Sequence, residues 1–284
     1  MAIQTVGIVG AGSMGSGIAN LAASAGYQVI LRDVEEQFIE SGLSRIDKFM
    51  SKSVEKEKIT VDEKQKVIGR IKTTTDIEDL KYADIVIEAI IEDMDAKKSV
   101  FAELDRVISE NVILVTNTSS LSITEIANAT ARTDRVAGMH FFNPAQLMKL
   151  VEIVRGYNTS DTTVEELQGF AKSLSKEPVV VNKDVPGFIV NRIMVPQFIE
   201  AIKLVEEGVA SPEDIDKAVT LGLNYPMGPF TLQDYAGVDI GYYVMEYMAD
   251  EFNDTRFAPP MLMKQMMRAG RIGKKSGAGF YDYE

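Results

Sequence analysis

The residues with the clearest chemical potential are the single histidine of the chain, His140, and an acid twelve positions later, Glu152. His140 closes the apolar run 136–139, and Glu152 lies inside a second run, 150–154, so each is predicted to belong to a buried strand. A carboxylate inside a buried strand is costly unless it is paired, and His140 is the partner that we expect. An imidazole oriented by a carboxylate is suited to general acid/base chemistry.

A lone histidine is more often a satisfied core residue than a functional one. Here the predicted strand delivers it to the edge of the sheet where a ligand is expected, and an acid is available to orient it. The functional interpretation therefore requires that the rest of the chain supply a ligand site at that edge.

A glycine-rich turn supplies that site. The segment 10–15, GAGSMG, follows the apolar strand 3–9 and opens a helical segment, 16–25, and the next strand, 28–32, ends at Asp33. This full context is the dinucleotide-binding fingerprint, although a glycine-rich turn in an α/β protein without a ligand has the same local sequence. The expected backbone contacts to the pyrophosphate come from Gly10, Gly12, Ser13, Met14 and Gly15.

The acid at the end of the second strand selects the cofactor. Asp33 would accept hydrogen bonds from the adenosine ribose and would repel a 2′-phosphate, so the sequence favours NAD over NADP. Arg32 beside it leaves NADP as a possible cofactor. We expect a Rossmann-type doubly wound sheet, with further contacts from the loops that follow its strands. Glu92 and Lys97, after strand 84–88, are candidates for the nicotinamide side.

A helical hairpin is predicted at about 35–70, because the strand at 84–88 begins about fifty residues after Asp33 and the spacer holds two helical segments. Lys48, Lys52 and Lys56 recur every four residues and share one helix face. Acidic residues are interleaved with them, so a solvated face is the ordinary interpretation. A row of cations on a projecting arm could instead hold the phosphates of a ligand.

A domain boundary is predicted at 184–188, DVPGF, where the pattern changes to helices only. The first domain covers residues 1–184. The second, residues 185–284, is all-helical, rich in methionine, and is predicted to form a homodimer. A glycine-rich tail carries two lysines, and its Phe280 and Tyr281 suggest that it docks rather than remains mobile.

Composition limits the alternatives. The net charge of −12 argues against nucleic acid as a partner. Without cysteine, disulfides and thiolate metal sites are ruled out, and we expect no metal. The amino-terminal segment lacks the pattern of a signal peptide and no apolar run approaches a membrane span, so a cytoplasmic protein is expected.

Together these segments resemble the L-3-hydroxyacyl-CoA dehydrogenase family along essentially the whole chain, and among its members the short bacterial enzymes for 3-hydroxybutyryl-CoA. The motifs that carry the resemblance are GIVGAGSMGSGIA, NTSSLSITEIA, HFFNPAQLMKLVEIV, DVPGFIVNRI, YPMGPFTLQDYAG and GKKSGAGFYDY. The resemblance implies NAD as cofactor and an acyl-CoA as substrate.

The resemblance also assigns roles. It implies that His140 is the catalytic base, that Glu152 orients it, and that Ser119 and Asn191 hold the substrate oxygen. It places on the cofactor Asp33, Glu92, Lys97, Asn117, Ser119, Asn143 and one of Lys274 and Lys275. It also favours Lys52 and Lys56 of the hairpin as contacts to coenzyme A.

The implied reaction is the reversible oxidation of (S)-3-hydroxyacyl-CoA by NAD⁺ to 3-oxoacyl-CoA. Two alternatives stay open. One is a related NAD-dependent dehydrogenase of a free hydroxy acid or sugar acid, without CoA. The other is a catalytically idle structural protein that binds NAD, which the set Ser119, His140, Glu152 and Asn191 disfavours.

Overall fold

The computed structural model of the chain describes residues 3–283. It divides into two compact units between Asp184 and Val185, and each unit has its own apolar core. The core of the first unit lies between a sheet and the helices that cover it, and the second core is formed among helices alone.

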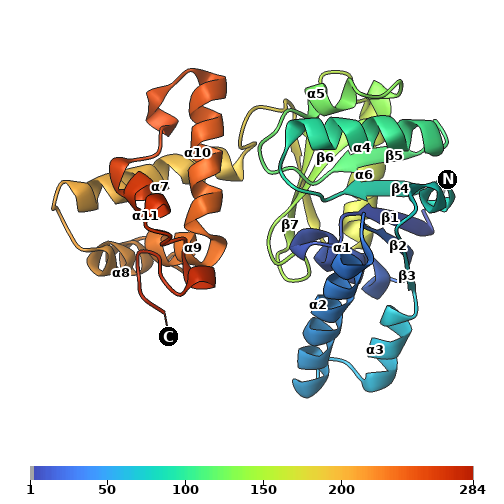
Figure 1. The fold of residues 1–284 in the computed structure, drawn as a ribbon, viewed down its shortest axis with the longest axis horizontal. Helices are drawn as coiled ribbons and strands as arrows, with labels where there is room; N and C mark the ends of the chain where they lie inside the picture. The colour runs from blue at the N-terminus through green and yellow to red at the C-terminus, as the bar shows by residue number, and fades with distance from the viewer. Residues whose placement is uncertain (1–2, 284) are drawn as a thin grey trace. The chain divides into compact units, whose positions relative to one another are not determined.

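The first unit is built on a single sheet of eight strands among its described residues (Figure 1). The strands are β1 (Thr5–Val9), β2 (Gln28–Arg32), β3 (Ile71–Thr74), β4 (Ile85–Glu88), β5 (Ile113–Thr116), β6 (Val136–Phe141), β7 (Leu150–Arg155) and β8 (Glu177–Val181). Their order is β3-β2-β1-β4-β5-β6-β7-β8, and every neighbouring pair is parallel except β6 with β7. The prediction of a Rossmann-type doubly wound sheet is confirmed. The chain reverses its direction of winding between β1 and β4, where such sheets bind ligands.

Helices connect the strands and bury the faces of the sheet. The central strands read as continuous apolar runs because both of their faces are covered. The helices of this unit are α1 (Ser13–Ser24), α2 (Glu36–Glu55), α3 (Val61–Ile68), α4 (Met94–Val107), α5 (Ile123–Ala127) and α6 (Asp161–Ser173), with a 3₁₀ turn at Ile77–Tyr82.

The predicted hairpin is formed by α2 and α3, which extend side by side beyond the sheet (Figure 1). Thr60 and Glu63 form a capping box that starts α3. Lys64 of α3 reaches back to α2, with its Nζ 2.6 Å from Asp47 Oδ1 and 2.8 Å from Ser51 Oγ. The arm is therefore fixed by polar contacts between its two helices as well as by its apolar side.

One strand, β3, and one α-helix, α6, were not predicted from the sequence. The strand 84–88 is not the next one after Asp33, because β3 pairs with β2 at the edge of the sheet. With one apolar residue, Ile71, in IKTT, β3 has no hydrophobic pattern that could reveal it. The helix α6 was also missed. Its Ser160 cap and amphipathic spacing are the signals that could have found it.

The second unit contains α7 (Val190–Glu206), α8 (Pro212–Gly222), α9 (Pro229–Ala236), α10 (Val238–Phe252) and α11 (Met261–Arg268). Four methionines are buried in its core: Met245, Met248, Met263 and Met266. Within residues 3–283, no helix combines the length and the apolar character that a membrane crossing requires.

The glycine-rich tail docks on this unit, as Phe280 and Tyr281 suggested. The Phe280 ring lies 4.6 Å from that of Phe230. Asp234 accepts the backbone N–H groups of residues 280 and 281, both at 2.9 Å. The hydroxyl of Tyr281 donates to Asp216 at 3.0 Å, and that of Tyr283 donates to Asp234 at 2.9 Å.

These contacts predict a loss of stability at high pH. Burial, and then hydrogen bonding to a carboxylate, raises the pKa of both Tyr281 and Tyr283. The two hydroxyls therefore contribute fully to the stability of the folded protein below the pKa of tyrosine in the unfolded state, which is about 10. This contribution is lost as the pH rises beyond that pKa. Between pH 8 and pH 11, we expect the Tm of the natural protein to fall further than that of a Tyr281→Phe, Tyr283→Phe double variant. Equal falls in calorimetry would contradict this assignment.

Candidate active site

The glycine-rich turn joins β1 to α1 in a form that only glycine permits at two positions. Gly10 has φ +102°, and a Cβ there would lie 2.5 Å from the backbone oxygen of Ala89, which follows β4. A Cβ on Gly15 would lie 1.8 Å from the backbone oxygen of Gly10. The first glycine therefore allows the turn, and the second allows α1 to approach β1.

The amino terminus of α1 fits an anionic group. Its N-cap is Gly12, which provides no side-chain cap, and its first turn contains no acid. A Cβ on Gly12 would meet no atom within 4 Å. The helix therefore begins beside open space at Gly12, without a side-chain cap or an acid in its first turn, which suits a pyrophosphate.

The carboxylate of Asp33 lies beside this turn. Its Oδ2 accepts the N–H of Ala11 at 2.6 Å, and its Oδ1 accepts the N–H of Val34 at 2.7 Å. The guanidinium of Arg45, on α2, donates to the oxygen of Ala11 at 3.2 Å. Asp33 is therefore held where it can meet an adenosine ribose, with a cation of the arm close by.

The structure brings His140 and Glu152 together. In the antiparallel pair β6–β7 they are directly opposite, so their side chains share one face of the sheet. Nδ1 of His140 lies 2.7 Å from Oε2 of Glu152, with both side chains buried. The ring of Phe142 lies 4.5 Å from the imidazole ring.

Neighbouring loops support the end of β6. The side-chain oxygen of Asn117, just after β5, accepts the N–H of Phe141 at 2.9 Å and thereby joins that loop to the residue after His140. Asn143 is exposed at the start of the β6–β7 connection. Buried Lys176 donates to the oxygens of Ala145 and Met148, both at 2.7 Å, and fixes this connection. Burial lowers the pKa of Lys176.

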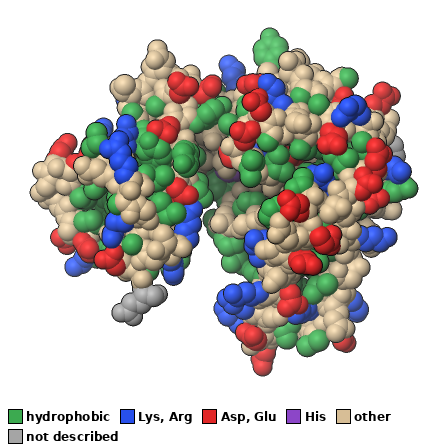
Figure 2. Space-filling model, viewed as in Figure 1, with side chains coloured by type: hydrophobic (Ala, Val, Ile, Leu, Met, Phe, Trp, Pro, Cys, Tyr) green, Lys and Arg blue, Asp and Glu red, His purple; other side chains and the backbone are tan. Residues whose placement is uncertain are grey.

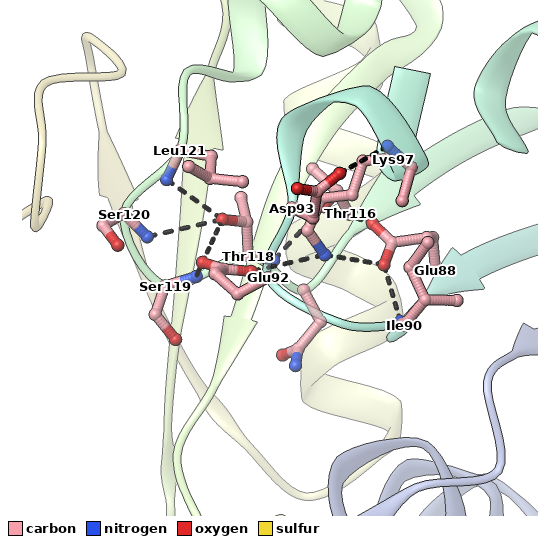
Figure 3. A network of polar contacts seen from close by, with 12 residues as sticks. Glu88, Ile90, Glu92, Asp93, Lys97, Thr116, Thr118, Ser119, Ser120 and Leu121 are labelled. Atoms are coloured by element: carbon pink, nitrogen blue, oxygen red, sulfur yellow. Dashed lines mark hydrogen bonds and ion pairs between the residues drawn. The ribbon is translucent and has the colours of Figure 1, made fainter. Parts of the chain in front are cut away.

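A polar network lies at the carboxyl ends of β4 and β5 (Figure 3). The ammonium of Lys97 lies 2.7 Å from Glu88 Oε1 and 3.3 Å from Glu92 Oε2. Glu92 Oε1 accepts the Thr118 hydroxyl at 2.6 Å and the N–H of Ser119 at 2.8 Å. The structure thus joins three of the predicted residues, Glu92, Lys97 and Ser119, in one network.

Other predicted residues lie elsewhere. Lys52 and Lys56 are exposed in and just after the last turn of α2, and Figure 2 shows basic side chains gathered at the end of the α2–α3 arm, with acidic ones beside them. Asn191 lies at the start of α7, in the second unit. In the tail, Lys274 Nζ lies 3.2 Å from the Tyr235 hydroxyl.

The remaining tail lysine is tied to its own unit as well, since Lys275 Nζ lies 2.7 Å from Asp239 Oδ2. Among residues 3–283, no group of three or more His, Cys, Asp or Glu side chains is arranged to hold a metal ion.

Glu88 also belongs to the polar network at the carboxyl ends of β4 and β5 and was not predicted from the sequence. Its side chain is fully buried, and it holds Lys97. The signal was present, because an acid closes an otherwise apolar central strand at the edge of the sheet where ligands bind.

The fold and the glycine-rich turn define a dinucleotide-binding α/β protein with a helical second unit. Residues 5–185 match the family described as "3-hydroxyacyl-CoA dehydrogenase, NAD binding domain", and residues 187–283 match "3-hydroxyacyl-CoA dehydrogenase, C-terminal domain". The chain therefore belongs to the 3-hydroxyacyl-CoA dehydrogenase family.

Similar proteins share its full length. The "Probable 3-hydroxybutyryl-CoA dehydrogenase" of Bacillus subtilis is 47% identical over 284 residues, which cover 100% of this chain and 99% of that protein. The mitochondrial hydroxyacyl-coenzyme A dehydrogenase of Sus scrofa is 43% identical, with 99% of this chain and 92% of that protein covered. The crystal structure of (S)-3-hydroxybutyryl-CoA dehydrogenase from Ralstonia eutropha has a TM-score of 0.95 and 45% identity, with both chains covered completely.

Proposed function

We propose that this protein is an NAD-dependent dehydrogenase of (S)-3-hydroxyacyl-CoA thioesters, with 3-hydroxybutyryl-CoA as its substrate. The reaction is reversible, and in the other direction acetoacetyl-CoA is reduced by NADH. The observation that carries the proposal is the buried pair of His140 and Glu152 at the edge of a sheet whose first turn fits a dinucleotide. Membership of the family and the names of its full-length relatives support the same reaction.

His140 handles the proton. Nδ1 donates to Glu152, and Nε2 takes the hydroxyl proton of the substrate as the alcohol becomes a ketone. Glu152 fixes the tautomer of the ring and stabilises the imidazolium that forms. Ser119 and Asn191 hydrogen-bond the substrate oxygen. When bound, NAD⁺ supplies the acceptor for the hydride from C3.

The cofactor is held along the carboxyl edge of the sheet. The backbone of residues 10–15 binds the pyrophosphate, and Asp33 binds the adenosine ribose. Glu92, Lys97, Asn117 and Asn143 serve the nicotinamide side, together with one of Lys274 and Lys275.

The direct test is oxidation of NADH on addition of acetoacetyl-CoA, followed by its absorbance. We expect turnover with NADH and a slower rate with NADPH, because Asp33 repels a 2′-phosphate. Absence of turnover with the thioester, together with turnover of a free 3-oxo acid, would support the dehydrogenase that does not use CoA. No turnover of either would support a protein that only binds NAD. An NADPH rate above the NADH rate would refute the role of Asp33.

Reversing two charges on the arm tests whether the substrate is a CoA thioester. Lys52→Glu with Lys56→Glu is expected to raise the KM for acetoacetyl-CoA about tenfold or more, with kcat little changed, because two phosphate contacts become repulsive. The matched control is Lys81→Glu with Lys172→Glu, which makes the same change in net charge at exposed lysines of the same unit outside the arm. Equal KM values in the two double variants would show that the arm does not bind the substrate.

We further propose that the protein is a homodimer formed through its second unit. Eight large apolar side chains described there are more than half exposed: Ile193, Val209, Leu221, Leu223, Tyr235, Ile240, Tyr243 and Met261. Sedimentation velocity should give about twice the chain mass of 31.3 kDa. A species of single-chain mass at micromolar concentration would contradict the dimer.

A further inference from the structure

The buried acid at the end of β4, Glu88, has no role in the reaction proposed above. Its strand lies between β1 and β5, near the middle of the sheet, and the residue is 0% exposed. A carboxylate in such a place requires several partners, because burial removes all of its hydration. The arrangement of those partners points to what it does.

Glu88 is fully partnered by donors from three separate segments. Its Oε1 accepts from the Lys97 ammonium and from the N–H of Ile90, both at 2.7 Å, and its Oε2 accepts from the Thr116 hydroxyl at 2.7 Å. These donors belong to α4, to the loop after β4 and to the end of β5. One buried side chain therefore ties together the segments after β4 and β5, which carry Glu92, Lys97 and Asn117 of the predicted nicotinamide-side residues.

Beyond Lys97, the charges alternate toward the surface. Lys97 is 1% exposed, whereas the Glu92 side chain is 41% exposed, so Glu92 is the member that a ligand can reach. The ammonium lies nearer to Glu88, at 2.7 Å, than to Glu92, at 3.3 Å. Glu88 thus draws Lys97 inward and leaves Glu92 to accept from Thr118 and Ser119 through its other oxygen.

We propose that Glu88 is a positioning residue for the nicotinamide end of the cofactor, which it orients through Lys97 and Glu92. This inference rests on the proposed function, in which Glu92 and Lys97 serve that end. When the charge of Glu88 is removed, Lys97 pairs with Glu92 alone. Glu92 is then drawn away from the N–H of Ser119, and the loop at 116–120 loses this contact.

The decisive variant is Glu88→Gln, which keeps the size of the side chain, removes its charge and replaces one accepting oxygen by a donating amide nitrogen. We expect the Kd for NADH, measured by its fluorescence, to rise about tenfold, which corresponds to about 1.4 kcal/mol. The Kd for ADP, measured by calorimetry, should stay within about twofold of the natural value. ADP contains the adenosine ribose and the pyrophosphate but lacks the nicotinamide and its ribose.

Asp105→Asn provides the matched control. Asp105 also pairs with a buried cation, since its Oδ1 lies 2.7 Å from Arg132 Nε, and it accepts the N–H of Ala131 at 2.9 Å. It belongs to the same unit, and no residue of the proposed site contacts it through these bonds. The variant loses a comparable charge pair, so it should lower the Tm while leaving both Kd values unchanged.

The outcomes separate a positioning role from a structural one. Unchanged NADH binding in Glu88→Gln overturns the proposal, and so does an equal weakening of NADH and ADP. If Glu88→Gln does not fold, Thr116→Val decides by the same criteria. It removes the hydroxyl that donates to Oε2 of Glu88 and that also accepts the N–H of Thr118 at 3.2 Å, and it should weaken the binding of NADH, but not of ADP, by about threefold. Failure of the natural protein to bind NADH would instead refute the proposed function.

Discussion

Replacing His140 with Gln is expected to lower kcat for acetoacetyl-CoA reduction by about 10²–10⁴-fold, the usual contribution of a positioned acid/base group. The glutamine amide can still bond to Glu152 but cannot take or return a proton at Nε2. NADH binding should be unchanged, since no proposed cofactor contact is lost. Steady-state turnover and NADH fluorescence titration measure the two quantities separately.

Glu152→Gln serves as the companion to this variant. It preserves the size of the partner and removes the charge that stabilises the imidazolium, so its kcat should fall as well, by a smaller factor than that of His140→Gln. Near-natural turnover in His140→Gln would refute the mechanism. A large loss of NADH affinity in that variant would show that the histidine serves cofactor binding instead.

Replacing Gly15 with Ala should have the largest effect on the fold of any single methyl addition in the turn. The new Cβ would lie 1.8 Å from the backbone oxygen of Gly10, so α1 must shift away from β1. Overpacking of this kind costs about 1–3 kcal/mol and occasionally more. We expect the upper end of that range in a lowered Tm, together with at least a tenfold loss of NADH affinity, because the helix terminus that faces the pyrophosphate moves.

Two other glycines provide controls. At Gly12 a Cβ meets no atom within 4 Å, so Gly12→Ala should keep the natural Tm and lower only the affinity for NADH. Gly169 lies inside α6 with equally open surroundings, and Gly169→Ala should raise stability by about 0.5–1 kcal/mol without affecting NADH. If Gly15→Ala kept the natural Tm and NADH affinity, the turn would accommodate a Cβ at this position, and the assigned role of Gly15 would be wrong.

Much of the fold could be predicted because its signals are local. The strand, glycine-rich turn, helix and Asp33 are contiguous, and their order alone specifies the first half of a doubly wound sheet. The capping residues Thr60 and Ser211 mark helix starts that the structure has. In contrast, β3 forms because it can pair with the edge of β2. This pairing depends on the assembled sheet and cannot be predicted from the local sequence IKTT.

The site divides in the same way. The proximity of His140 and Glu152 could be anticipated, since each would be costly to bury alone, but their catalytic role stays a prediction. The contacts of Glu88 could not be anticipated, because they join residues 9 and 28 positions away in sequence. Charge balance of this kind depends on which strands become neighbours, and a linear pattern carries no information on that.

The reversal of direction at β7 has a consequence for how this enzyme could be altered. Because β6 and β7 are held in register along their length, the parity of the pairing, and not the connection at 142–149, sets His140 against Glu152. A slip of one residue would turn Glu152 to the opposite face. The connection could therefore be lengthened or exchanged without redesigning the proton-transfer pair, provided that the pairing of the two strands is preserved.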